Sequence, residues 1–140
     1  MIRQATAADA DQLFALVEQL GHALEPDRTG FERVLAGYLA GEEPSVVLLV
    51  AEEGDRVVGY AIVTIAPLLS TSGPAAQLQE IVVDRGIRGS DLGTQLVRAV
   101  EEECVRRGVR QLTVASRRAG GFYDRLGYHE NAEYMRRFFD

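Results

Sequence analysis

The fold is decided by residues 77–94, which read QLQEIVVDRGIRGSDLGT. Gln77–Asp84 is rich in β-branched residues and predicts a strand. Asp91–Arg107 carries apolar residues at helical spacing and predicts a long helix. The turn between them holds small residues and two arginines, which would let an anion approach the unpaired N–H groups at the start of the helix. These small residues and arginines are Arg85, Gly86, Arg88, Gly89, Ser90 and Gly93.

The turn matches neither of two common nucleotide-binding motifs. A P-loop has four residues between its glycines and then a lysine. Gly89 and Gly93 have three residues between them and are followed by Thr94, and the chain contains no lysine. The spacing of Gly86, Gly89 and Gly93 also fails the G-x-G-x-x-G fingerprint. An ordinary strand-to-helix turn, with glycines for chain reversal only, stays the alternative.

The remaining chain alternates strands and helices, which predicts a mixed α/β fold in a single domain, residues 1–140. Strands are predicted at Met1–Gln4, Ser45–Glu52, Arg56–Ile65, Gln77–Asp84 and Gln111–Ala115, with one or two more in Tyr128–Phe139. Helices are predicted from a capping arrangement at residues 6–9 to Gly21, from a capping box at residues 29–32 to Gly41, and at Asp91–Arg107 and Ala119–Leu126. Ala66–Pro74 is predicted as a loop. Residues 77–115 form a βαβ unit, so its two strands should be parallel and adjacent.

Composition narrows the classes of protein and partner. The 140 residues are 46% hydrophobic and 26% charged, as in a globular domain. No apolar run is long enough for a membrane helix and the N-terminus does not resemble a signal peptide, so we expect a cytoplasmic protein. A net charge of −6 argues against nucleic acid as a partner. A single cysteine excludes a disulfide framework and a multi-cysteine zinc site, and we expect no metal site.

Two motifs and their separation carry a resemblance to a known family. Residues 78–84 (LQEIVVD) and 88–94 (RGSDLGT) look like a strand followed by an R/Q-x-x-G-x-G/A turn, and residues 122–128 (FYDRLGY) look like a C-terminal "FY…GF" element. Residues 57–60 (VVGY) fit the third strand. The chain resembles, over essentially its whole length, the GNAT superfamily of acetyl-CoA-dependent N-acetyltransferases. Within it, the chain loosely resembles aminoalkylphosphonate-type and other small-amine acetyltransferases.

The resemblance implies a fold and a cofactor site. The fold would be a central mixed sheet of six to seven strands, splayed between strands 4 and 5 and flanked by about four helices. The splay would open a slot for acetyl-CoA, the acyl donor, whose pantetheine arm pairs with strand 4 like an added strand. The implied acetyl-CoA-binding residues are Ile81, Val82 and Val83 for the arm, Arg88, Gly89, Ser90, Asp91, Leu92, Gly93 and Thr94 for the pyrophosphate, and Phe122 at the thioester end.

The chain departs from the family pattern at two places. Asp91 stands where the turn usually has glycine, and we expect its carboxylate to point outward and cap the helix. Gln77 and Gln79 stand where relatives often carry an acid or a histidine. Glu80 is the only acid nearby, and simple alternation puts it on the opposite face from the two glutamines, although a bulge could re-aim it.

The chemistry needs a neutral amine and a proton for the departing thiolate. Tyr123 fits the proton donor on its place in the motif, and its alternative role is core packing beside Phe122. Glu80 could accept the amine's proton through water; the alternatives are a partly solvated strand residue and a reaction without a dedicated base. The expected acceptor region is the first two helices and their loop, with His22, Glu25, Asp27 and Tyr38. We expect Cys104 to be buried in the core and His129 to lie at the surface.

The leading hypothesis is therefore an enzyme that N-acetylates a small amine or a peptide N-terminus. The alternative is a catalytically weak acetyl-CoA-binding sensor or interaction module, which the glutamine pair favours and Tyr123 opposes. A homodimer is a further expectation, with Met135–Phe139 as the segment that could mediate it.

Overall fold

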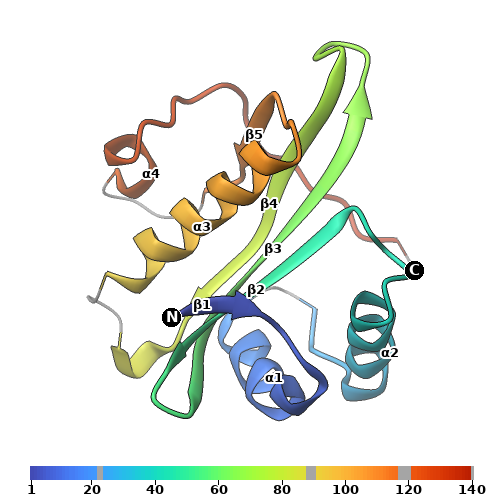
Figure 1. Ribbon diagram of the computed structural model, residues 1–140, viewed down its shortest axis with the longest axis vertical. Helices are drawn as coiled ribbons and strands as arrows, with labels where there is room; N and C mark the ends of the chain where they lie inside the picture. Colours follow the sequence, from blue (N-terminus) through green and yellow to red (C-terminus); the bar gives the residue numbers. More distant parts are fainter. Residues whose placement is uncertain (22–23, 88–90, 117–120, 140) are drawn as a thin grey trace.

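A computed structural model of the chain describes residues 1–21, 24–87, 91–116 and 121–139. Five strands form one sheet in the order β1-β2-β3-β4-β5 (Figure 1). Their bounds are Ile2–Gln4 (β1), Val46–Glu53 (β2), Arg56–Leu68 (β3), Gly73–Val83 (β4) and Gln111–Val114 (β5). The first four pair antiparallel, and β5 pairs parallel with β4. The βαβ unit predicted between residues 77 and 115 is therefore present.

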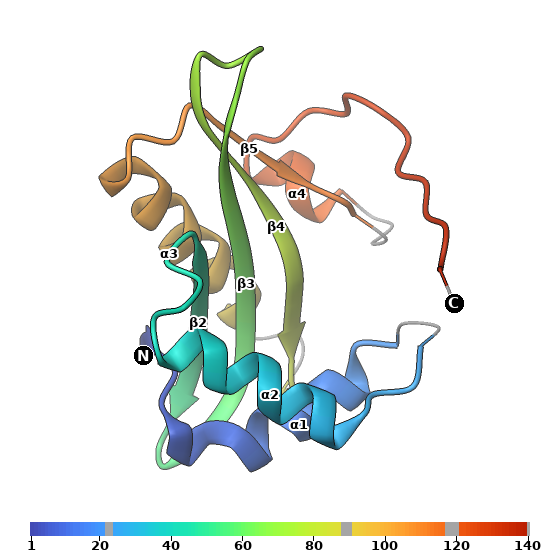
Figure 2. The same ribbon diagram turned by 90° about the vertical axis from the view of Figure 1, so that its right-hand side faces the viewer.

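Helices cover both faces of the sheet. The bounds are Ala7–Asp9 (η1), Ala10–Gln19 (α1), Arg28–Leu39 (α2), Arg85–Ile87 (η2), Leu92–Arg106 (α3) and Phe122–Arg125 (α4). One core cluster joins α3 and Tyr123 of α4 to the sheet, and a second joins α1 and α2 to the other face. We refer to these as the α3 face and the α1–α2 face. Figure 2 shows α1 and α2 in front of the sheet and α3 to one side.

The mixed α/β class is confirmed, but the predicted strand count is too high. The described chain has five strands rather than six to seven, because Tyr128–Phe139 contains none. Strand-forming side chains make a strand only where a neighbour supplies hydrogen bonds, and this segment runs along the outside of the molecule (Figure 2). Its apolar side chains are exposed instead of packed: Tyr134, Met135, Phe138 and Phe139.

The hairpin between β3 and β4 is longer than predicted. Ala66–Pro74 was expected to be a loop, yet β3 continues to Leu68 and β4 begins at Gly73. Pro67 lies opposite Pro74 in the register, so the two prolines of this stretch share one position of the ladder. The turn itself contains Ser72, whose φ of 52° is in the left-handed region.

An ionic cluster attaches the short β1 to its surroundings. Arg3 donates to both carboxylate oxygens of Asp9, at 2.8 and 2.9 Å, and to Glu52 at 2.8 Å. Asp9 also accepts from the backbone N–H of Thr6 at 2.7 Å, as the predicted capping arrangement requires. The Arg3 guanidinium, foremost, holds the pKa of the buried Asp9 carboxyl below its usual range. This cluster joins β1, η1 and β2 because each contributes one member.

Helix α2 starts earlier than its predicted capping box. Asp27 is the residue before the first turn, and its carboxylate accepts from the N–H of Gly30 at 3.3 Å. Within α2, Leu35 is buried, whereas Val34 is exposed. Helix α4 begins at Phe122, and residues 119–120 of the predicted Ala119–Leu126 helix lie outside the described residues.

Gly59 of β3 lies so close to β4 and α3 that a larger residue there should destabilise the protein. A Cβ there would lie 2.8 Å from the Val82 carbonyl oxygen and 3.3 Å from Leu96 Cδ1. Gly59→Ala should lower the free energy of unfolding by about 1–3 kcal/mol, since backbone must shift to admit the methyl group. Gly37→Ala in α2 is the matched control: its Cβ meets nothing closer than 3.7 Å, so it should be neutral or stabilise by up to about 1 kcal/mol. Equal urea midpoints for the two variants would contradict this account.

Candidate active site

Strands β4 and β5 diverge after a short parallel pairing. The register joins Ala75–Leu78 to Gln111–Val114, and β4 then continues to Val83 beyond the end of β5. Figure 2 shows β5 turning away from β4 along its length. The splay expected between strands 4 and 5 is therefore present. It places Ile81, Val82 and Val83, the predicted pantetheine-binding residues, in the part of β4 that extends past β5.

A β-bulge in β4 decides which way Glu80 points. In the pairing with β3, Glu80 is opposite Ile62 and Leu78 is opposite Val63, so Gln79 is an extra residue. An extra residue interrupts the alternation of side chains. Leu78 belongs to the core cluster of the α3 face, whereas Glu80 contacts Tyr60, which belongs to the cluster of the α1–α2 face. Simple alternation was therefore wrong, because the bulge re-aims Glu80.

Glu80 is tied to the neighbouring strand by a buried phenol. The Tyr60 hydroxyl donates to Glu80 Oε1 at 2.7 Å, and the Gln79 amide donates to Thr64 Oγ1 at 2.9 Å. Burial, then the Glu80 charge, raises the pKa of Tyr60. Tyr38 of α2 is near enough to respond to the same carboxylate, because its pKa is raised by burial first and by the Glu80 charge next. Tyr38 and Glu80 thus share one polar region on the α1–α2 face.

The N-terminus of α3 lies on the other face, against α4. Gly93 is in the first turn of α3, and a Cβ there would lie 3.5 Å from Phe122 Cζ and 4.0 Å from Val83 Cγ2. The two motifs that carried the family resemblance are thus in contact. Leu92 is buried and Thr94 is half-buried, while Arg88, Gly89 and Ser90 lie outside the described residues.

Asp91 occupies the N-cap position of α3 but does not cap through its side chain. Its backbone carbonyl accepts from the N–H of Gln95 at 3.0 Å, whereas its carboxylate makes no capping hydrogen bond. The residue is exposed, as expected for a carboxylate turned outward. The prediction that the Asp91 carboxylate caps the helix is therefore wrong. The physical reason is its backbone, which has φ −83° and ψ 4° instead of the extended conformation of a capping residue.

Tyr123 is anchored by aromatic contacts. Its side chain is 7% exposed, and its ring makes edge contacts with Phe122 and Tyr128 at centroid distances of 4.9 and 5.7 Å. Arg98 of α3 donates to the Leu126 carbonyl at 3.3 Å and holds the end of α4. The predicted core-packing role of the ring is present, and it does not conflict with a role for the hydroxyl.

Asp84 supports the turn between β4 and α3, a role that the sequence analysis missed. Its carboxylate accepts from the N–H of Gly86 at 3.0 Å and pairs with Arg56 at 2.7 Å. The Gly86 bond, foremost, holds the pKa of Asp84 below its usual range. The side chain of Gln19 in α1 accepts from the N–H of Arg85 at 2.9 Å. An Asp directly after a strand and two residues before a glycine is a usual turn signal and could have identified this role.

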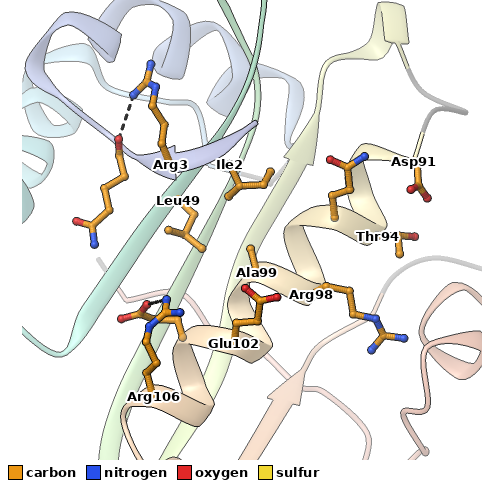
Figure 3. A pocket seen from close by; sticks show the side chains of 12 residues that line it. Ile2, Arg3, Leu49, Asp91, Thr94, Arg98, Ala99, Glu102 and Arg106 are labelled. Carbon is orange, nitrogen blue, oxygen red and sulfur yellow. Dashed lines mark hydrogen bonds and ion pairs between the residues drawn. The ribbon is translucent and has the colours of Figure 1, made fainter.

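A groove of about 520 Å³ between β1 and α3 is a weaker candidate site (Figure 3). Three of its arginines are neutralised: Arg3 by Asp9 and Glu52, Arg98 by Glu101, and Arg106 by Glu103. Neither Glu80 nor Tyr123 lines it. Asp91 and Thr94 lie at one end, so the groove meets the candidate active site only at the start of α3.

The other sequence-predicted residues divide into three groups. Tyr38 lies near Glu80, as described above. Glu25 is exposed and Asp27 caps α2, so neither is shown in an acceptor role, and His22 lies outside the described residues. Cys104 is buried in the core and His129 is exposed, both as predicted.

With this geometry established, comparisons with known proteins define the class. Residues 11–128 match the acetyltransferase (GNAT) family model. The chain belongs to this family, and it is an acetyl-CoA-dependent acyltransferase. No helix within the described ranges has both the length and the apolar composition to cross a membrane.

Individual known proteins are similar to the chain in sequence or in fold. The chain is 32% identical over 135 residues to the aminoalkylphosphonate N-acetyltransferase of Salmonella typhimurium, covering 93% of this chain and 85% of that protein. Among solved structures, it superposes on glucosamine-6-phosphate N-acetyltransferase from Arabidopsis thaliana with a TM-score of 0.85 and 23% identity, covering 100% and 98% of the two chains. A transcriptional regulator from Bacillus halodurans gives a TM-score of 0.87 and 24% identity, with 99% of both chains covered. The two structural likenesses concern the fold alone.

The contact between Gly93 and Phe122 limits the size of the side chain that position 93 can carry. Gly93→Ala should bind CoA within a few-fold of the wild type, because its methyl group fits at 3.5 Å from the ring. Gly93→Val should weaken CoA binding about ten-fold, since its γ-carbons displace the ring and obstruct the helix N-terminus. Isothermal titration calorimetry with CoA measures both. Wild-type affinity in Gly93→Val would show that CoA does not approach this turn.

Proposed function

We propose that this enzyme transfers the acetyl group of acetyl-CoA directly to a primary amine of a small molecule or a peptide N-terminus. The observation that carries the proposal is the arrangement around the diverging end of β4. The contact between Gly93 and Phe122, with the buried Tyr123 beside it, lies on the α3 face. The Glu80 carboxylate lies on the α1–α2 face. A donor and an acceptor could therefore approach from opposite faces and meet between β4 and β5.

The donor side fits acetyl-CoA on two grounds. The first turn of a helix offers N–H groups to an anion, and the missing side chain at Gly93 lets Phe122, the proposed thioester end, lie against that turn. The extension of β4 past β5 suits an added strand-like ligand. We assign Asp91, Leu92, Gly93 and Thr94, with Arg88, Gly89 and Ser90, to the pyrophosphate. Ile81, Val82 and Val83 are assigned to the pantetheine arm, and Phe122 to the thioester end.

Each reacting group has a proposed partner in the chain. Acetyl-CoA supplies the acetyl group and the thiolate leaving group. The amine nitrogen forms a bond to the acetyl carbon as the carbon–sulfur bond breaks. Glu80 accepts the proton lost by the amine nitrogen, directly or through water, and the Tyr123 hydroxyl gives a proton to the sulfur. The acceptor amine would lie against the α1–α2 face, where Glu80 and Tyr38 supply negative charge and an aromatic surface.

The proposal that Tyr123 is a proton donor makes a kinetic prediction. Tyr123→Phe keeps the ring that packs against Phe122 and Tyr128 but removes the hydroxyl. It should lower kcat about 10²-fold or more while leaving the affinity for acetyl-CoA within two-fold, because general acid catalysis contributes at this scale. Stopped-flow or steady-state detection of released thiol measures the effect. An unchanged kcat would remove Tyr123 from the mechanism.

The same assay separates the enzyme from the alternative of an acetyl-CoA-binding sensor. Wild-type protein is incubated with acetyl-CoA and a panel of amines that includes aminoalkylphosphonates, hexosamine phosphates, polyamines and short peptides. Amine-dependent thiol release supports the proposed function. Calorimetric binding of acetyl-CoA without release for any amine would favour the sensor.

We also propose a cytoplasmic homodimer in which residues 129–139 contact a second copy. The segment carries Met135 and Phe139 at 85% and 86% exposure, and apolar side chains gathered on one exposed segment are typical of an interaction surface. Covering them with a second copy would remove this surface from water.

The dimer proposal is tested by light scattering after size-exclusion chromatography. The wild type should elute as a dimer, and the double variant Met135→Asp, Phe139→Asp as a monomer, since charges oppose burial of the segment. Leu69→Asp is the matched control, because Leu69 is 100% exposed but belongs to the turn between β3 and β4, outside the segment. A monomeric wild type, or a dimer in the double variant, would refute the proposal.

A further inference from the structure

We infer that Tyr60 is a positioning residue of this enzyme: its hydroxyl fixes one oxygen of the Glu80 carboxylate so that the other oxygen receives the proton of the acceptor amine. The inference rests on the proposed function, because it assigns Tyr60 a role through Glu80. Tyr60 does not touch the substrate in this scheme and keeps its own proton throughout.

The position of Tyr60 comes from the register of β3 and β4. Glu80 is opposite Ile62 and Val82 is opposite Tyr60, so Tyr60 and Glu80 are diagonal neighbours across the two strands. Diagonal neighbours are within reach of long and aromatic side chains on one face of a sheet. The bulge at Gln79 is required for this contact, because regular alternation would direct Glu80 to the α3 face.

Burial makes the Tyr60 hydroxyl a fixed donor. The side chain is 1% exposed and packs with Leu13 and Leu16 of α1, Leu35 of α2 and Val82 of β4. Such packing leaves the ring little freedom, so the 2.7 Å bond to Glu80 Oε1 is held in one geometry. The raised pKa of Tyr60 keeps its hydroxyl protonated at the pH at which amines are acetylated. It therefore donates to the carboxylate and does not compete for the amine's proton.

The remaining carboxylate oxygen is left for the acceptor. Among the residues that the structure describes, Oε2 of Glu80 accepts no hydrogen bond, and the residue is only half-buried. The side-chain amide of Gln79 next to it donates to Thr64 instead. One carboxylate oxygen is thus committed to an internal donor, and in the proposed scheme the other takes the proton of the amine. A proton acceptor held in a fixed direction gains rate through orientation.

A purely structural role is the competing explanation. A buried phenol is costly without a hydrogen-bond partner, and Glu80 could serve only to satisfy Tyr60. The two explanations differ in what happens when Glu80 is already lost. A positioning residue acts through Glu80 and has nothing left to position, whereas a structural residue keeps its effect.

A double-mutant cycle on the rate of thiol release applies this distinction. Tyr60→Phe, Glu80→Gln and the double variant are compared with the wild type, using an amine that the wild type acetylates. Tyr60→Phe should lower kcat about ten-fold with the KM for acetyl-CoA within two-fold, and Glu80→Gln should lower kcat about 10²-fold. The double variant should be at most about two-fold slower than Glu80→Gln, since the effects of two residues that act through each other do not add.

A control for stability comes from a second phenol–carboxylate pair. The Tyr128 hydroxyl donates to Glu101 at 2.6 Å, on the α3 face. Tyr128→Phe and Tyr60→Phe each remove one such bond, and both should lower the free energy of unfolding by about 1–3 kcal/mol. Tyr128→Phe keeps the ring that packs against Tyr123, so only Tyr60→Phe should show the ten-fold loss in kcat. Should Tyr60→Phe not fold, Glu80→Asp replaces it: its shorter side chain reaches the hydroxyl poorly and should lose kcat about ten-fold.

The outcomes separate this inference from the proposed function. Equal loss of kcat from Tyr60→Phe with and without Glu80 overturns the positioning role, as does a wild-type kcat in Tyr60→Phe or in Glu80→Asp. Full activity in Glu80→Gln removes Glu80 as proton acceptor and the role of Tyr60 with it, while amine acetylation itself stands. Wild-type protein that releases no thiol with any amine overturns both.

Discussion

The rest of the site depends on one irregularity, the extra residue at Gln79 in β4. A regular strand would direct every second side chain to the same face from Gln77 to Val83. The bulge lets Leu78 fill the core beneath α3 while Glu80, two residues later, faces α1 and α2. It also lies just beyond the last residue of β4 that pairs with β5, so the change of side-chain direction coincides with the divergence of the strands. The Glu80 carboxylate therefore lies close to the point at which β4 and β5 separate.

This arrangement divides the molecule into two sides with different chemistry. The α3 face is closed by close packing, in which Gly93 allows Phe122 to approach the first helical turn. The α1–α2 face instead keeps Glu80 and Tyr38 half-buried above a buried phenol. Burying a carboxylate is costly unless hydrogen bonds compensate, and Tyr60 supplies such a bond without adding charge. The site can therefore retain a negative group close to the core.

The sequence predicted regular features well and irregular ones poorly. The strand that ends at Val83 and the helix that ends at Arg106 could be predicted, because β-branched content and helical spacing are local properties. The direction of Glu80 could not, since a bulge depends on pairing with β3. The prediction of strands in Tyr128–Phe139 failed for the same reason. These residues favour extended structure, but no neighbouring strand of the described chain pairs with them. Tyr60 was overlooked within an apolar strand, although a tyrosine in such a run needs a partner for its hydroxyl.

A hydrogen bond also joins α1, on one face of the sheet, to the turn that leads into α3 on the other face. Gln19, in the last turn of α1, accepts from the N–H of Arg85, and Asp84 beside it binds both Gly86 and Arg56. The turn that precedes α3 is thus held partly by the helix that covers the opposite face. Loops usually move more than the elements they connect, and a turn that offers N–H groups to an anion loses affinity when it must first be ordered. Tying the start of that turn to α1 reduces this cost, and under the proposed function it makes the position of α1 matter for the donor site as well as for the acceptor side.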